Sequence, residues 1–467
     1  MTRPDQLPEQ PSRAHDDAVA RETAARAAAA EPLTSPHDGA PGPVREQLTA
    51  TVEALSADLI GLSHRLHADP ETAFTEHRSV AAVAELLARH GIPAEVGVHG
   101  LDTALRARIG SGGGGSGGVS GDGGYGDGEG DAAAGPTIAV LAEYDALPGI
   151  GHACGHNVIC ASAVGAFLAL ARQLHDSPVP GTVLLLGTPA EEGGGGKETM
   201  ARDGALDGVD AAVMLHPFAH DIADHPFLGR RQLEVTYHGV AAHASAHPHR
   251  GRNALDAVVM GYQGVAMLRQ HLPDGDRVHG VVVDGGQVPN VVPERAAARY
   301  YLRSQHPDTL QDLTERVRAI AVAAAAMTGC GYTLTWDPNP PYLPIRHNRT
   351  LAARWSQHQA ARGRTVYPRG VVPESETGST DLGNVSVRVP SIHPMIAIAE
   401  PGTALHTTAF AEAAAGPAAD RAVLDGAAGL ALVVADLLHD AGLRAAVATE
   451  FAEAGGPVDV PSFFDTA

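Results

Sequence analysis

The sequence predicts an α/β fold whose mostly parallel sheet is covered by helices, with a second, smaller domain inserted into it. Short, continuously apolar runs at residues 137–141, 183–187 and 211–215 suit strands that are buried on both faces. Segments with helical periodicity separate these runs, which is the β-α-β order of a parallel sheet. A later stretch, residues 230–338, has the order β-α-β-β-α-β, which is typical of a ferredoxin-like domain.

The first part of the larger domain is expected over residues 44–229. Helical periodicity covers residues 44–68 and 78–90, and a long helix is expected over residues 161–174. A Gly-rich turn then leads into a short helix at residues 197–203. These helices would cover the sheet that the apolar runs form.

The inserted domain, residues 230–338, is expected to contain four strands and two helices. The strands are predicted at residues 232–238, 277–283, 295–303 and 332–336, and the helices at residues 253–271 and 310–328. A Pro-rich stretch at residues 338–344 ends this domain, and the second part of the larger domain follows over residues 339–445. That part is predicted to contain helices at residues 351–361 and 422–439 and an apolar run at residues 392–398.

Three further segments lie outside these elements. Residues 1–43 are polar, acidic and rich in Ala and Pro, so we expect a disordered tail there, and residues 446–467 are expected to form a C-terminal tail. Residues 111–135 are Gly-rich and lie between strand-like segments at 103–109 and 137–141, which predicts a flexible, overlong hairpin loop. Because the glycines precede no helix, they do not predict a phosphate-binding loop.

Composition and charge exclude several classes of function. The chain has 33 Lys and Arg against 54 Asp and Glu, a formal charge of −21, which argues against a nucleic-acid-binding protein. No apolar run approaches the ~20 residues of a membrane span, and the N-terminal segment has no secretory signal pattern. The 3 cysteines are too few for a disulfide framework. We therefore expect a cytoplasmic protein that binds neither nucleic acid nor a membrane.

Acidic, imidazole and thiol groups follow each of the three apolar strands. They are Asp145, Cys154 and His156 after the first strand, Glu191 and Glu192 after the second, and His216 after the third. The carboxyl edge of an open α/β sheet is where ligands bind. A single one of the 25 histidines would be weak evidence, but this combination on neighbouring strands indicates a metal site, since buried carboxylates need partners.

The types of side chain suggest which metal would bind. Thiolate and imidazole favour Zn²⁺, while carboxylates also admit Mn²⁺ or Co²⁺. There are more candidate ligands than one tetrahedral ion needs, which predicts two divalent ions roughly 3.5–4 Å apart. Glu191 and Glu192 leave their strand in different directions, so one can bind metal while the other handles protons.

Several motifs resemble a known family. DALP at residues 145–148, GHACGH at 151–156 and PAEEG at 189–193 resemble the aminoacylase/carboxypeptidase-type dinuclear metallopeptidases. Within these they are similar to the amidohydrolase branch with a Cys ligand, which includes hippurate, auxin-conjugate and aminobenzoyl-glutamate hydrolases. IGHACGHN at residues 150–157 looks most similar to the Xaa-Arg/β-alanyl-lysine dipeptidase group. The resemblance covers roughly residues 44–438.

The resemblance implies a role for each site residue. Cys154 would bridge the two ions, and four further ligands would complete their sites: His156, Glu192, His216 and His406. Glu191 would be the general base and then the general acid toward the leaving amine. Asp145 would orient an imidazole ligand.

The resemblance also gives the inserted domain a role, as a lid and dimerisation domain. His243 would cross to the active site of the neighbouring subunit of a homodimer and stabilise the oxyanion, unless the histidines around it form a metal-scavenging tract. Asn290 and Arg303 match positions that contact substrate, and an arginine there could bind a substrate carboxylate, although a plain surface arginine is an equal alternative. Ser379 lies in a segment, GSTD at 378–381, that resembles the family's substrate-side loop, with Thr380 where Glu is common.

We therefore expect a dinuclear metal amidohydrolase that cleaves a dipeptide or an N-acyl amino acid. An aminobenzoyl-glutamate-type hydrolase that works with a paralogous subunit is the alternative within enzymes. A catalytically silent binding or regulatory relative is the alternative from another class. Glu191 separates these classes, because a silent relative has no reason to keep the base beside a complete set of ligands.

Overall fold

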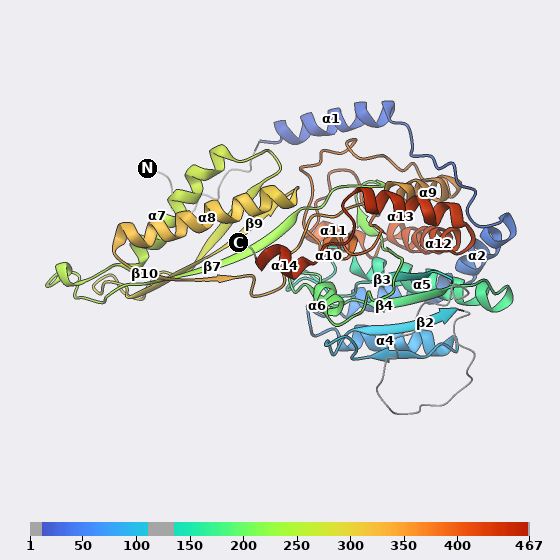
Figure 1. Ribbon diagram of the computed structural model, residues 1–467, viewed down its shortest axis with the longest axis horizontal. Coiled ribbons are helices and arrows are strands. Elements are labelled where there is room, and N and C mark those ends of the chain that lie inside the picture. The colour runs from blue at the N-terminus through green and yellow to red at the C-terminus, as the bar shows by residue number, and fades with distance from the viewer. Residues whose placement is uncertain (1–11, 111–134, 466–467) are drawn as a thin grey trace.

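A six-stranded sheet lies at the centre of the larger part of the molecule, which we call the body (Figure 1). The computed structural model describes residues 12–110 and 135–465. The sheet order is β1-β2-β4-β3-β5-β11, with β1 Ala94–Val96, β2 Leu105–Gly110, β4 Thr182–Gly187, β3 Thr137–Ala142, β5 Ala211–Val213 and β11 Ser391–Ile392. The pairs β4–β3, β3–β5 and β5–β11 are parallel, whereas β1–β2 and β2–β4 are antiparallel. The mixed α/β fold with a mostly parallel sheet is confirmed.

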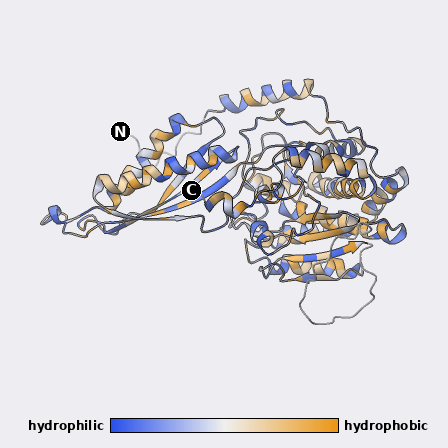
Figure 2. Ribbon diagram, viewed as in Figure 1, coloured by the Kyte–Doolittle hydropathy of each residue, from blue (hydrophilic) through white to orange (hydrophobic). Residues whose placement is uncertain are grey.

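Helices cover this sheet. They are α2 Gly42–Ala54, α3 Ser56–Ala68, α4 His77–Arg89, α5 His156–Asp176, α6 Gly196–Arg202, α9 Arg349–Ala361, α10 Leu382–Ser386, α11 Thr408–Ala413, α12 Pro417–His439 and α13 Ala441–Glu453. The central pair is α5 and α12, which pack closely because small residues face each other: a Cβ on Gly165 would lie 2.9 Å from Ala427 Cβ. By length and composition both helices could cross a membrane, contrary to the expectation from the apolar runs, but most of each is buried in the body like an ordinary core helix. Figure 2 shows the same apolar character in the neighbouring strands.

The predicted hairpin between the strands at 103–109 and 137–141 is wrong. Strand β4 lies between β2 and β3 and pairs with both, so the two strands are not neighbours. The sequence could not show this, since β4 comes some forty residues after β3 in the chain and sheet order depends on long-range pairing. The Gly-rich segment itself, residues 111–134, lies outside the described residues.

The inserted domain contains its own four-stranded antiparallel sheet in the order β10-β7-β9-β8. Its elements follow the chain as β7 Gly229–His238, α7 Ala254–Leu268, β8 Arg277–Asp284, β9 Arg295–Ser304, α8 Pro307–Thr328 and β10 Gly331–Trp336. Apolar side chains such as Leu233, Val278 and Leu302 pack against α7 and α8 and form a separate core. In Figure 1 this domain extends away from the body.

Two paired chain segments join the inserted domain to the body. At its entry Arg230 N donates to Tyr342 O at 2.8 Å, and at its exit Tyr342 N donates back to Arg230 O at 2.9 Å. Strand β7 therefore begins beside the body and runs outward from it. The strands β6 His216–Phe218 and β12 Met395–Ala397 form a separate two-stranded parallel sheet.

Both predicted tails contain ordered structure. Residues 14–29 form α1 Ala14–Ala29, where runs of alanine favour a helix, and residues 1–11 lie outside the described part. The segment after α1 is tied to α12, since Ala40 N donates to Asp436 Oδ1 at 2.7 Å. At the other end the chain continues through α13 into α14 Val460–Asp465, whose Val460 and Phe464 are buried in the core of the inserted domain. The disordered N-terminal tail over residues 12–43 and the tail over 446–465 are therefore corrected.

Candidate active site

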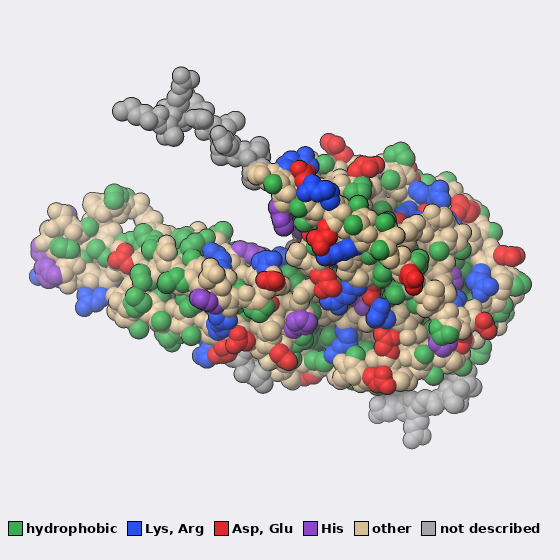
Figure 3. Space-filling model, turned by 90° about the horizontal axis from the view of Figure 1, so that it is seen from above, with side chains coloured by type: hydrophobic (Ala, Val, Ile, Leu, Met, Phe, Trp, Pro, Cys, Tyr) green, Lys and Arg blue, Asp and Glu red, His purple; other side chains and the backbone are tan. Residues whose placement is uncertain are grey.

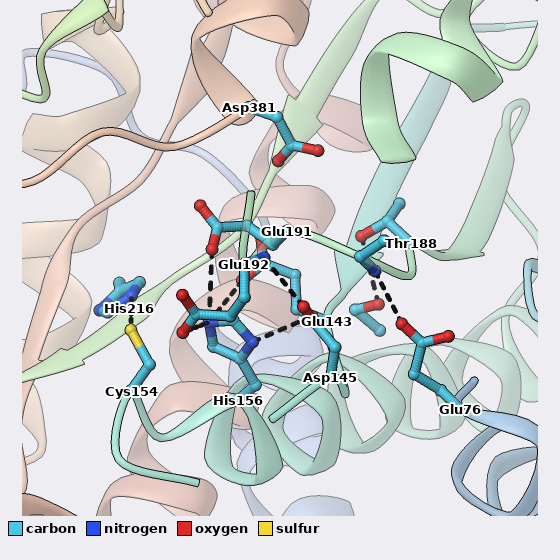
Figure 4. A network of polar contacts seen from close by, with 12 residues as sticks. Glu76, Glu143, Asp145, Cys154, His156, Thr188, Glu191, Glu192, His216 and Asp381 are labelled. Carbon is cyan, nitrogen blue, oxygen red and sulfur yellow. Dashed lines mark hydrogen bonds and ion pairs between the residues drawn. The ribbon is translucent and has the colours of Figure 1, made fainter. Parts of the chain in front are cut away.

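The carboxyl ends of three strands bring the predicted residues together, as Figure 4 shows. Glu143 and Asp145 follow β3, and the loop after them leads through Cys154 to the first residue of α5, His156. Glu191 and Glu192 follow β4. His216 follows β5 as the first residue of β6. The prediction that these groups meet at one sheet edge agrees with the structure.

Cys154 lies between two groups of candidate metal ligands. Its Sγ is 3.4 Å from His216 Nε2, and the ligand atoms of Cys154, His156 and His216 all lie within 4.8 Å of one another. A second group within the same limit contains Cys154, Glu192 and His406, with His406 Nε2 at 3.7 Å from Glu192 Oε1. Cys154 is therefore the residue that these two candidate groups share.

The rings of His216 and His156 are oriented so that one nitrogen of each points toward the other candidate ligands. His216 Nδ1 lies 2.7 Å from Pro217 O, which leaves Nε2 directed at Cys154. Burial lowers the pKa of His216 to about 3, so the ring is neutral and keeps the lone pair that a metal needs. His156 Nδ1 is 3.1 Å from Asp145 Oδ1, which is the carboxylate–imidazole contact expected of a metal ligand.

The Asp145 carboxylate contacts two neighbouring residues. Its Oδ1 contacts His156, and its Oδ2 accepts the Glu192 N–H at 2.9 Å. Burial works against ionisation, but the His156 ring and this hydrogen bond lower the pKa of Asp145 below its usual value. Asp145 therefore stays charged and fixes both a ligand imidazole and the backbone of a ligand carboxylate.

The two adjacent glutamates differ in what they face. Both lie near His156 Nε2, with Glu191 Oε2 at 3.8 Å and Glu192 Oε1 at 3.9 Å. Glu192 belongs to the group with Cys154 and His406, whereas Glu191 belongs to a third candidate group with Glu143 and His156. Ala190, just before them, has φ 61°, a left-handed conformation that costs a non-glycine residue about 1–2 kcal/mol. That strained turn is held by Glu76, which accepts the Ala190 N–H at 2.9 Å.

The buried carboxylates of the site favour the binding of cations. Burial, Glu143 and Glu192 raise the pKa of Glu191 well above its usual value, and burial raises the pKa of Glu192 to about 7. Three buried atoms in the site have no hydrogen-bond partner among the described residues: Glu143 Oε2, His156 Nε2 and Glu192 Oε1. Divalent ions would satisfy these atoms, and the donor set of sulfur, imidazole and carboxylate suits Zn²⁺, Mn²⁺ or Co²⁺. The residues present therefore fit a metal centre.

Sequence reasoning missed a buried ion network beside the ligands. Lys197 Nζ donates to Glu143 Oε1 and, at 2.6 Å, to Asp381 Oδ1, and all three residues are at most 2% exposed. Two signals could have indicated it. Lys197 is the single lysine of the chain, directly after four glycines, and Glu143 follows the end of β3 just as Asp145 does.

The predicted substrate residues fall into two groups. Arg303 is the last residue but one of β9 and lies opposite Arg230, where the inserted domain joins the body. Burial, His156 and the positive charge of Arg303 lower the pKa of His406. Ser379 lies in the loop that leads to Asp381, and its buried Oγ has no hydrogen-bond partner among the described residues.

His243 and Asn290 lie at the outer end of the inserted domain. Ala244 N donates to Asn290 O at 3.0 Å, and His243 Nδ1 accepts from Ala246 N at 3.1 Å, so their contacts are local. Strand β7 has 10 residues, which separates this end from the body by about 30 Å at ~3.3 Å per residue. Figure 3 shows histidine side chains at this far end. Within one chain these two residues do not reach the candidate site, and their role in a neighbouring subunit stays a prediction.

Comparison with known proteins gives one family and a consistent set of relatives. The profile of peptidase family M20/M25/M40 matches residues 139–428. The chain is 35% identical over 414 residues to the Xaa-Arg dipeptidase of Mus musculus, covering 87% of this chain and 90% of that protein. It is 29% identical over 449 residues to a p-aminobenzoyl-glutamate hydrolase subunit from Escherichia coli, covering 80% of this chain and 88% of that protein.

Solved structures share the fold. A putative aminohydrolase from methicillin-resistant Staphylococcus aureus aligns with a TM-score of 0.64 at 21% identity, over 84% of this chain and 100% of that one. A dinuclear metal binding peptidase of the M20 family from Bacillus subtilis aligns with a TM-score of 0.59 at 21% identity, over 82% of this chain and 99% of that one.

Proposed function

Because the chain belongs to peptidase family M20/M25/M40, it is a metal-dependent hydrolase of amide bonds, and we propose that it cleaves dipeptides or N-acyl amino acids that release a residue with a free α-carboxylate. The observation that carries this proposal is Arg303. Arg303 is half-buried on the inserted domain and has no ion pair among the described residues, and its charge lowers the pKa of His406 after the effects of burial and of His156. An arginine fork beside the reaction centre suits the carboxylate of a leaving amino acid.

The proposed centre would hold two divalent ions, with Cys154 in the ligand group of each. His156 and His216 would complete one ligand group, and Glu192 and His406 the other. When bound, the ions polarise the scissile carbonyl and lower the pKa of water. Metal analysis of the purified protein distinguishes Zn²⁺, Mn²⁺ and Co²⁺.

Glu191 is the proposed proton carrier. It is buried beside the ligand groups without belonging to either of those that contain Cys154. Its carboxylate takes a proton from the attacking water and returns it to the leaving nitrogen, as a general base and then a general acid. Tyr342 supports this position, since its hydroxyl donates to Glu191 O at 3.0 Å.

The inserted domain is proposed to act as a ferredoxin-like lid in a homodimer. Strand β8 is an edge strand of its sheet and exposes Val281, Val282 and Val283 at 58%, 50% and 45%. Exposed apolar edge strands favour pairing with another chain. Such a dimer would allow His243 and Asn290 to reach the site of the partner, where His243 would stabilise the oxyanion.

The relatives support this substrate class, but their names imply different released amino acids. The name of the mouse protein implies arginine as the leaving residue, and that of the Escherichia coli protein implies glutamate; both are amino acids with a free α-carboxylate. The alternatives are an aminobenzoyl-glutamate-type hydrolase that needs a second, paralogous subunit, and a silent binding protein. Glu191 beside a full ligand set favours an enzyme.

Metal analysis followed by a panel of dipeptides and N-acyl amino acids tests the proposal. We expect turnover by the wild-type protein with Mn²⁺, Co²⁺ or Zn²⁺ and little turnover by Glu191→Gln, which should keep its metal. Glu192→Gln is the matched control and should lose metal. A metal-loaded protein that cleaves no member of the panel would contradict the proposal, and activity that appears only with a second subunit would favour the first alternative.

A further inference from the structure

The loop that carries Glu191 and Glu192 is held by two parts of the molecule. From the body, Glu76 accepts the Ala190 N–H at 2.9 Å, and Asp145 accepts the Glu192 N–H at 2.9 Å. The two chain segments that join the inserted domain to the body also contact this loop. The candidate base therefore lies where both the body and the domain junction hold its backbone.

Three side chains of the junction donate hydrogen bonds to backbone carbonyls of this loop. The Tyr342 hydroxyl donates to Glu191 O at 3.0 Å, and Asn339 Nδ2 donates to Gly193 O at 3.0 Å. Arg230 Nη2 donates to the same Gly193 carbonyl at 3.4 Å. Both segments of the junction contribute, since Arg230 belongs to the entry into the inserted domain and the other two donors belong to the exit from it.

The Tyr342 side chain is itself fixed in the junction. It is 1% exposed, and the Arg230 guanidinium lies over its ring at 3.9 Å. The backbones of the same two residues are hydrogen-bonded in both directions, at 2.8 and 2.9 Å. A side chain that is locked by its ring and by its backbone holds the group that it contacts within a narrow range of positions.

The Glu191 carboxylate depends on its backbone for its position. No side chain in residues 12–110 and 135–465 donates a hydrogen bond to this carboxylate, and His156 Nε2 lies 3.8 Å from it. The turn just before it is strained, with Ala190 at φ 61°, and such a conformation persists only where the surrounding structure holds it. Loss of a backbone contact would therefore displace the carboxylate.

We propose that Tyr342 is a positioning residue for Glu191. This inference rests on the proposed role of Glu191 as proton carrier and adds the residue that sets its place. The Tyr342 hydroxyl acts on the backbone carbonyl of Glu191 and takes no part in the proton transfer itself. The same hydrogen bond ties the base to the junction of the inserted domain, so that the two keep a fixed relation.

The replacement Tyr342→Phe tests this role, because it removes the hydroxyl and keeps the ring beneath Arg230. On the panel substrate that the wild type cleaves fastest, we expect kcat to fall by about 10–100-fold, since a misplacement of about 1 Å can cost ~100-fold. KM and metal content should not change. Tyr237→Phe is the matched control: its buried hydroxyl also donates to a backbone carbonyl, Ala321 O at 3.1 Å, but within the inserted domain, and its loss should leave kcat unchanged.

A double variant separates positioning from a general structural role. If Tyr342 acts through the Glu191 carboxylate, Tyr342→Phe should lower kcat by less than ~2-fold in a Glu191→Gln protein, because groups that act as a unit are not additive. Asn339→Ala tests the same loop from an exposed position. It should lower kcat by about 2–10-fold, the worth of one hydrogen bond, again at unchanged KM and metal content.

Three results would overturn this inference and leave amide hydrolysis intact. They are a wild-type kcat in Tyr342→Phe, a loss of kcat that persists at full size in the Glu191→Gln protein, and a loss of metal that accompanies the loss of activity. Absence of turnover by the wild type on the whole panel would instead overturn the proposed function, and this inference with it.

Discussion

Replacing Lys197 by Met should destabilise the protein far more than an ordinary loss of an ion pair. Lys197 is 2% exposed, and its ammonium is held between Glu143 and Asp381, both of which are 0% exposed. Lys197→Met keeps the length of the side chain but leaves two carboxylates in the interior without their shared cation. Its buried backbone N–H would still donate to Asp381 Oδ2, at 2.9 Å, so the loop itself is retained.

The magnitude follows from the burial of the partners. Removing one partner of a buried pair costs about 3–5 kcal/mol, because the remaining charge is uncompensated. Here two charges remain, which places the expected loss in the free energy of unfolding at the upper end, about 5 kcal/mol. By comparison, Arg299→Met breaks an exposed pair with Glu234 and should cost at most ~1 kcal/mol.

Urea unfolding of metal-loaded protein, followed by far-UV circular dichroism, measures this loss. A triple variant, Lys197→Met with Glu143→Gln and Asp381→Asn, removes all three charges and should recover most of the stability. A Lys197→Met variant within ~1 kcal/mol of the wild type would refute the reasoning. A triple variant as unstable as Lys197→Met would show that the ammonium acts through shape and not through charge.

Four other predictions concern the reaction centre. Glu191→Gln should lower kcat by about 10²–10⁴ at unchanged metal content, measured by steady-state assay and elemental analysis. Cys154→Ser should weaken metal binding in a chelator competition, and thiol reagents should inactivate the metal-free wild type faster than the holoenzyme; equal rates would remove this thiol from the ligand set. Because the pKa of Glu192 is raised to about 7, the folded metal-free protein holds a proton that the unfolded chain releases above about 4.5. Its stability should therefore fall as pH rises from about 4.5 to about 7, and metal loading should remove this dependence in thermal melts. His243→Ala and Glu191→Gln should each be nearly inactive alone, yet a purified mixed dimer should regain one working site in two; no gain over the parents would place His243 in its own subunit or outside catalysis.

The sequence allowed the site to be predicted where the chemistry is local to strand ends. Asp145, Cys154 and His216 each lie within a few residues or one loop of an apolar run, so the parallel sheet itself brings them together. Lys197 and Asp381 were missed because they are 184 residues apart and meet only through tertiary packing. A buried lysine with two carboxylates leaves no periodic pattern in the sequence.

The errors in the fold have a similar origin. Helix α13 has no clear apolar stripe, so its residues resembled a tail, although Leu443 and Val447 are buried. The pairing of β2 with β4 depends on contacts between segments some eighty residues apart, which strand-like patterns cannot supply. Elements with strong periodicity and short connections, such as α4 and the strands of the inserted domain, were predicted within a few residues of their ends.

The paired connection between Arg230 and Tyr342 lies at the end of the inserted domain that meets the body. In any rotation of the domain with this junction as its pivot, the displacement of a residue grows with its distance from the junction. A rotation of about 10° would carry the outer end, some 30 Å away, through about 5 Å, while a residue beside the pivot would move by less than ~1 Å. Arg303 lies opposite Arg230 at the pivot, whereas His243 lies at the outer end. Arg303 would therefore stay in place to bind a carboxylate whatever the angle of the inserted domain. Only groups at its outer end, such as His243, would approach and withdraw during a catalytic cycle.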